Sequence, residues 1–207
     1  MSIGQAIFTS TKTDRAQGYQ IACHSEGIEP DDLQELSVWG PSHDSLLHAD
    51  RGAASYNFFP LPSGAFCVSR TTAHGAEYSG RGQLIYTQNL VVPASDLLRF
   101  ANNPFAVLRA ATATGLLQHD EQIPSHLDPV QLHGRSLPVD QMLLTQVVSK
   151  LGPLRMATLI QAALHSEWLA ILCDQKSELI FQALVNCLPV QVRPAAGGAC
   201  CAGGSAS

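Results

Sequence analysis

Charged side chains are scarce in this 207-residue chain, where Asp, Glu, Lys and Arg together make up only 14%. That share is well below the quarter that is usual for a soluble domain, so we expect a sizeable uncharged surface that can lie against a partner protein. Basic residues are the rarer sign, with 12 Lys and Arg against 17 Asp and Glu and a formal net charge of -5. A negative chain repels phosphate backbones and anionic lipid headgroups, which disfavours nucleic acid and membranes as partners.

Long apolar runs are also missing. No stretch approaches the roughly 18 apolar residues of a membrane helix, and the opening residues 1–5 lack the basic start and apolar core of a leader peptide. We therefore expect a cytoplasmic protein. Hydrophobic residues still make up 45% of the chain, enough for the core of one generous domain or two small ones.

Several catalytic motifs are absent. The sequence contains no Gly-x-Ser-x-Gly elbow, no Gly-x-x-x-x-Gly-Lys phosphate loop and no Cys-x-x-Cys pair. Hydrolase and nucleoside-triphosphatase functions therefore lose their usual sequence support. The cysteines number six, and four of them fall within apolar segments, where reduced and buried thiols are the simpler interpretation. These four are Cys23, Cys67, Cys173 and Cys187.

The segments that are present predict an α+β fold whose amino-terminal domain, residues 1–116, is rich in antiparallel hairpins. Alternating apolar residues, turn residues and helix-start residues give the assignment. The expected strands are 5–10, 18–23, 55–59, 65–70 and 83–92, and the expected helices begin at Pro30 and after Pro93. Seven side chains are expected to line the apolar strand faces: Phe8, Ile21, Phe66, Leu84, Tyr86, Leu90 and Val92.

A polar linker is predicted at residues 117–137, where periodicity disappears. Beyond it, residues 138–193 predict an incomplete α/β unit, with helices beginning at Pro138 and Pro153, a strand at 168–173, and a helix capped by Asp174. Asp174 could instead be a ligand at a strand's carboxyl end. Residues 194–207 hold mostly Pro, Ala, Gly, Cys and Ser, so we expect a disordered tail that adds nothing to stability.

One loop could bind an anion. Arg70 and Arg81, together with His74, Ser79 and glycine-exposed backbone amides, could surround a phosphate-bearing ligand. The alternative is a long hairpin connection whose arginines are held by local carbonyls, because no Lys-Ser/Thr or third glycine completes a phosphate motif.

Two further groups of residues resemble catalytic or metal sites less closely. Cys23 and His24 are neighbours on a strand, so their side chains point to opposite faces and cannot act as nucleophile and base. A polar stretch also concentrates possible metal ligands, but it lacks the spacing of a helical His pair, so solvated loop residues are favoured. These ligands would be His119, Asp120, Glu121, His126, Asp128 and His133.

Several short motifs resemble the bacterial GTPase-associated protein 1 family, in its type-2 amino-terminal domain and part of its middle region. The motifs are Gly18-Tyr19-Gln20, Ser69-Arg70, Tyr78-Ser79-Gly80-Arg81 with Asn89-Leu90-Val91, and later Asp174, Cys187-Leu188-Pro189 and Arg193. Gly82-Gln83 and the low-complexity run at 195–201 depart from the family pattern. The second departure suggests a truncated or frameshifted reading frame that could leave a sheet edge exposed.

The resemblance implies a non-catalytic adaptor or regulator that needs no cofactor and acts by protein–protein contact with a GTPase in a bacterial conflict or signalling system. It supplies no catalytic residues. The alternative from another class is a ligand sensor or enzyme that binds a phosphate-bearing ligand at the Arg70, His74 and Arg81 loop.

Overall fold

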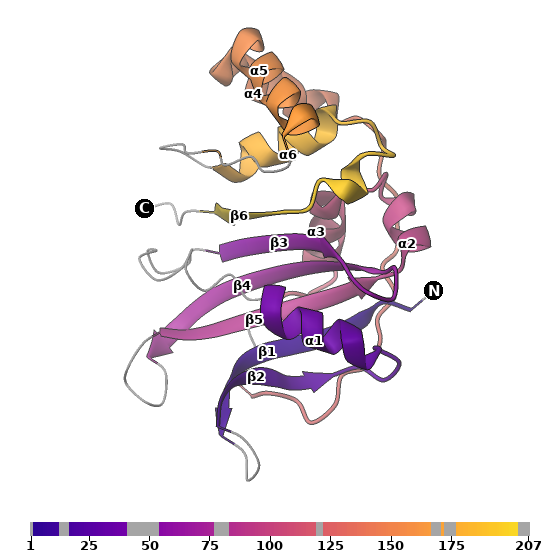
Figure 1. The fold of residues 1–207 in the computed structure, drawn as a ribbon, viewed down its shortest axis with the longest axis vertical. Helices are drawn as coiled ribbons and strands as arrows, with labels where there is room; N and C mark the ends of the chain where they lie inside the picture. The colour runs from indigo at the N-terminus through magenta and orange to yellow at the C-terminus, as the bar shows by residue number, and fades with distance from the viewer. Residues whose placement is uncertain are drawn as a thin grey trace.

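In the part of the chain that the structure describes, the strands form one antiparallel sheet of six, in the order β2-β1-β5-β4-β3-β6 (Figure 1). The structure is a computed structural model that describes residues 2–12, 17–40, 54–76, 83–118, 122–166, 171 and 177–202. The strands are β1 (Gly4–Lys12), β2 (Gln17–His24), β3 (Ala54–Pro60), β4 (Phe66–Ala76), β5 (Gln83–Val92) and β6 (Gly198–Ala202). The described residues also form six α-helices, so the predicted α+β class is confirmed.

Both predicted hairpins are confirmed. Strands β1 and β2 pair antiparallel, as do β3 and β4, whose connecting turn is closed by a 2.8 Å bond from the Leu61 N–H to the Ala65 carbonyl. Within that turn Gly64 has a φ of +83°, a conformation that residues with a Cβ resist. Strand β5 lies between β1 and β4, so the two hairpins meet through it.

Helices cover both faces of the sheet, as Figure 1 shows. Helix α1 (Pro30–Trp39) lies on one face, where its buried Leu36 packs near Cys67 and Val91. Helices α2 (Ala94–Arg99) and α3 (Pro104–Ala113) lie on the other face, and their buried side chains join those of the strands in the largest apolar cluster. The sheet is therefore the middle of three layers.

Helix α3 was not among the predicted elements, although its start has a clear sequence signal. The Asn103 side chain caps the helix by accepting a 3.0 Å bond from the Phe105 N–H, and Pro104 occupies the first helical turn, where its missing N–H costs nothing. The Asn-Pro pair could have identified this helix from the sequence.

The carboxyl-terminal residues form a helical lobe, at the top of Figure 1, made of α4 (Gln141–Leu151), α5 (Pro153–His165) and α6 (Ser177–Cys187). The predicted start at Pro138 is wrong by a few residues, because Asp140 caps α4 by accepting a 3.0 Å bond from the Leu143 N–H. The predicted strand at 168–173 falls, except for Ile171, outside the described residues, and so does Asp174.

The predicted disorder of the tail is wrong for the residues that the structure describes. A short 3-10 turn, Arg193–Ala195, leads into β6, which pairs antiparallel with β3 from Phe58 opposite Gly198 to Ala54 opposite Ala202. Composition misled the prediction because a strand added to an existing edge gains hydrogen bonds from its backbone and needs few apolar side chains of its own.

The stretch predicted as a polar linker contacts the amino-terminal domain at several points. Val130 pairs with Ile3 through two backbone hydrogen bonds of 2.7 and 2.9 Å, and Leu132 is buried in the apolar cluster of α2 and α3. The boundaries at 117 and 137 stay a prediction. Within the described ranges, no helix combines the length and the apolar character that crossing a lipid bilayer requires.

Candidate functional site

Arg70 and His74, the two described members of the predicted anion loop, lie on the same face of β4 because they are an even number of residues apart. Four residues of strand place their Cα atoms about 13 Å apart along its axis. Ser79 and Arg81 lie outside the described residues.

The Arg70 guanidinium forms a hydrogen bond with the protein's own backbone. Its Nη1 donates a 2.7 Å hydrogen bond to the carbonyl of Leu117. Leu117 has a φ of +62°, a left-handed conformation that costs energy for a residue with a side chain, and its own side chain is buried. Arg70 therefore stabilises a strained turn after α3, 47 residues away in the sequence, whereas the alternative predicted for this arginine was a bond to local carbonyls of the hairpin connection.

The His74 ring contacts two neighbours on the same sheet face. Its Nε2 lies 2.7 Å from the Thr72 hydroxyl oxygen, and its plane stands edge-on to the Tyr86 ring at 6.3 Å between centroids. Tyr86 also lines a cavity of about 330 Å3, together with Leu116, Gln118 and Leu127. Among the residues that the structure describes, the side chains lining this cavity are apolar or neutral, so its chemistry suits a neutral polar ligand better than a phosphate.

A second hollow, of about 320 Å3, lies between α3, α6 and strand β3, which is next to the edge strand β6. The Tyr56 ring from β3 and apolar residues of α3 form part of its wall. A polar chain forms its rim, in which Arg109 Nη1 donates to Gln182 at 3.3 Å and Gln182 Nε2 donates to Glu178 at 2.8 Å. This hollow, called the edge groove below, combines an apolar wall with a polar rim, as ligand pockets do.

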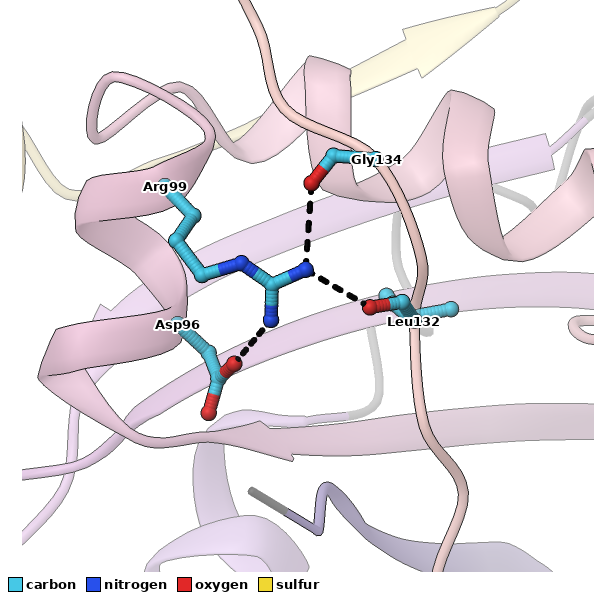
Figure 2. Close-up of polar contacts among 4 residues, drawn as sticks. All are labelled: Asp96, Arg99, Leu132 and Gly134. Atoms are coloured by element: carbon cyan, nitrogen blue, oxygen red, sulfur yellow. Dashed lines mark hydrogen bonds and ion pairs between the residues drawn. The ribbon is translucent and has the colours of Figure 1, made fainter.

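Two other arginines hold distant parts of the chain together. Arg99 at the end of α2 forms an ion pair with Asp96 at 2.7 Å, and its Nη2 donates to the carbonyls of Leu132 and Gly134 at 3.0 and 3.1 Å. Figure 2 shows the guanidinium between the helix and the passing chain. Arg99 thus fastens the predicted linker to the amino-terminal domain.

Arg193 is the most buried of these arginines, with 2% of its surface exposed. Burial lowers the pKa of its guanidinium below the ordinary value. Its three nitrogens donate to backbone carbonyls at 2.6 to 3.0 Å, which is how a buried cation without a carboxylate partner is satisfied. The acceptors are Leu188, Ala101, Pro138 and Asn186. One side chain therefore joins α6, the turn after α2 and the start of the helical lobe.

The polar side chains buried under α1 have a structural role. Asn57 Nδ2 donates to the carbonyls of Trp39 and Gly40 at 2.6 and 3.0 Å, and the Ser69 hydroxyl donates to the Gly40 carbonyl at 3.1 Å. These bonds satisfy carbonyls that the end of a helix leaves without partners. The sheet thus caps the helix that covers it.

The described candidates for a nucleophile–base pair and for a metal site do not come together as such sites. Cys23 is buried among apolar side chains whereas His24 is exposed, as the alternation of strand faces predicts. His126 Nε2 lies 3.3 Å from Asp128, and both side chains are largely exposed. Among the described residues no three His, Cys, Asp or Glu side chains converge; His119, Asp120 and Glu121 lie outside that part of the chain.

The buried thiols make the free energy of unfolding depend on pH in the alkaline range. Burial raises the pKa of Cys67, fully enclosed beneath α1, and also those of Cys23 and Cys187. The folded chain therefore keeps thiol protons that the unfolded chain releases, so the free energy of unfolding should fall above about pH 9, by up to about 1.4 kcal/mol per pH unit for each thiol. Urea unfolding between pH 8 and 10.5 measures this slope. Cys67→Ala should flatten it, and an identical slope in that variant would contradict the assignment.

Sequence reasoning missed the edge groove and the clamping role of Arg99. A basic residue in the last turn of α2 is a general helix feature and does not reveal which carbonyls it binds. No local sequence signal could have identified the edge groove, because its residues come from three separate segments, in β3, α3 and α6.

Fold and contacts together define an α+β sheet module whose carboxyl-terminal lobe is fastened to it by the buried Arg193. The profile of one protein family, described as GTPase-associated protein 1, N-terminal domain type 2, matches residues 2–131. This is well over half of the chain, and the chain belongs to that family. No curated protein and no solved structure matches it.

Proposed function

We propose that this protein is a non-catalytic adaptor or regulator that binds a GTPase by direct protein contact within a bacterial conflict or signalling system. The observation that carries the proposal is the family match over residues 2–131, because the family is named for its association with a GTPase. The low content of charged residues agrees with a surface that is covered by a protein partner.

Five exposed apolar residues on three neighbouring segments, called here the junction surface, are the part of the molecule best suited to this contact. They are Leu98, Leu137, Val139, Met142 and Val192. The Ser136 N–H bonds to the Arg99 carbonyl at 3.1 Å, and Arg193 bonds to the Pro138 carbonyl at 2.6 Å. These bonds bring the three separate segments to one corner of the molecule.

The composition of the junction surface sets the expected energetics. Leu137 is 79% exposed and Met142 is 85% exposed, so covering either side chain removes a large apolar area from water. A fully buried side chain of this size contributes about 1.5–3 kcal/mol. Since aromatic and aliphatic anchors dominate such interfaces, binding should depend on these residues more than on charge.

The test is binding of the purified chain to a GTPase encoded beside it, measured by interferometry. Met142→Ser and Leu137→Ser should each weaken binding about tenfold, whereas raising NaCl from 0.1 to 0.5 M should weaken it less than about threefold. Leu154→Ser on α5 is the matched control, since that leucine is 80% exposed but lies outside the junction surface. No binding of the GTPase at micromolar concentrations would contradict the adaptor proposal.

Calorimetry against a nucleotide panel tests the competing proposal, a sensor or enzyme for a phosphate-bearing ligand. That proposal requires saturable, salt-sensitive binding that Arg70→Ala and Arg81→Ala abolish, since a charge-assisted contact contributes about 1.5–3 kcal/mol. The adaptor proposal expects neither nucleotide binding nor hydrolysis. Micromolar binding of a nucleotide to the unaltered chain, lost in either arginine variant, would support the ligand-binding function.

A further inference from the structure

Strand β3 is the edge strand of the family-matched region. The match ends at residue 131, and within it the sheet order ends β5-β4-β3. The sixth strand, β6, comes from residues 198–202, beyond the match. The outer hydrogen-bonding groups of β3 are therefore an acceptor edge that this chain fills with its own later segment.

The segment that fills this edge pairs with β3 through its backbone. Strand β6 has the sequence Gly-Ala-Cys-Cys-Ala, and a Cβ built on Gly198 would meet no atom within 4 Å. Residues 195, 197 and 198 are exposed, although they lead into or belong to the paired strand. The short tether from the buried Arg193 keeps β6 close to the edge of β3.

The edge groove adjoins this acceptor edge. Tyr56 of β3 lines the groove, and the register places position 200 directly opposite Tyr56. Cross-strand partners in a sheet lie on the same face, so a strand in this register presents one side chain beside the groove of about 320 Å3. Position 200 is a cysteine in this chain, and a leucine at that position would be a larger side chain.

We propose that the β3 edge and the edge groove form a strand-addition site for an extended, uncharged segment of the GTPase partner, and that β6 is the chain's own competing occupant. The incoming segment pairs antiparallel with Ala54–Pro60, which contains no charged residue, and places a large apolar side chain opposite Tyr56. Backbone hydrogen bonds provide affinity in such a site, and the groove provides specificity.

In this arrangement β6 regulates access to the site. Because it is tethered, it competes at a high effective concentration and leaves the site only for a segment that gains more from the groove. The identity of the partner rests on the proposed function, whereas the strand-addition site itself is testable without a GTPase.

The experiment uses the full chain and two fluorescein-labelled peptides. The first, Ala-Gly-Gly-Ala-Leu-Ser-Ala-Gly, copies residues 196–203 with Leu for Cys200 and Ser for Cys201; the second has Ala in place of that Leu. Of the neighbouring positions 200 and 201, one directs its N–H at β3. Replacing both residues by proline removes that N–H in either case, so the double variant Cys200→Pro/Cys201→Pro loosens β6. Cys200→Leu should have the opposite effect and hold β6 in place, because the leucine of the tethered strand fills the edge groove.

Fluorescence anisotropy should show the Leu peptide binding the proline variant at least about tenfold more tightly than the unaltered chain. The Ala peptide should bind that variant about fivefold more weakly than the Leu peptide, and Cys200→Leu should raise the melting temperature and abolish peptide binding. Equal binding of the Leu peptide to all three chains would overturn the site, as would equal affinity of the two peptides. Dimerisation of the proline variant in place of peptide binding would overturn it too.

If the proline variant does not fold, Cys200→Leu still decides the question, because a lowered or unchanged melting temperature contradicts a groove that accepts the side chain. GTPase binding by the unaltered, proline and Leu chains then tests the partner. Weaker binding to Cys200→Leu and tighter binding to the proline variant supports it. Equal GTPase binding with clear peptide binding overturns only the identity of the partner, and no GTPase binding at all contradicts the proposed function.

Discussion

Arg193→Ala is expected to lower the free energy of unfolding by about 3–5 kcal/mol, the range for breaking a buried, fully bonded charged group. The guanidinium is 2% exposed and donates to four carbonyls that the substitution leaves without their donor. Each buried carbonyl without a donor costs about 1–3 kcal/mol, less where water enters the space that the side chain leaves.

Urea unfolding followed by circular dichroism measures this loss. Arg193→Lys should recover only a small part of it, because one ammonium group cannot reproduce the fork of guanidinium donors. Arg155→Ala on the exposed surface of α5 is the matched control and should change stability by less than about 0.5 kcal/mol. An Arg193→Ala chain with the same urea midpoint as the control would show that the clamp contributes nothing to stability.

Leu90→Ala is expected to cost about 2–5 kcal/mol, whereas Leu84→Ala should cost less than half as much. Leu90 is 1% exposed in the cluster beneath α2 and α3, but Leu84 is only half-buried. Both lie on the same face of β5, and the difference arises because the ladder between β1 and β5 ends at Thr9 opposite Tyr86, before Leu84 is reached. Equal losses in the two variants would contradict this account.

The predicted core was correct where strands have neighbours on both sides. Among the seven side chains assigned to it, Phe8, Tyr86, Leu90 and Val92 are buried. Ile21, Phe66 and Leu84 are half-buried, because they lie on an edge strand or at the end of a strand. Period-2 alternation identifies the face of a strand, but only the order of strands in the sheet tells which positions on that face are covered.

Local sequence signals predicted the hairpins and α1 because turn residues and a helix-start proline act within a few positions of themselves. Strand β6 could not be predicted in that way, since its conformation depends on the free edge of β3 more than on its own residues. The candidate site, too, could be predicted only in part. Strand alternation predicts that Arg70 and His74 share a face, but nothing near Arg70 in the sequence indicates that it bonds to Leu117, 47 residues away.

The pairing of Ile3 with Val130 joins the two ends of the family-matched region. A domain whose ends lie side by side can be inserted into a surface loop of a host protein, because the loop needs to open by little more than the spacing of two strands. The same geometry permits circular permutation, with the original ends joined by a short linker and new ends opened in a turn such as that at Gly64. The ends of the matched region are therefore placed so that it can be inserted or permuted as one unit.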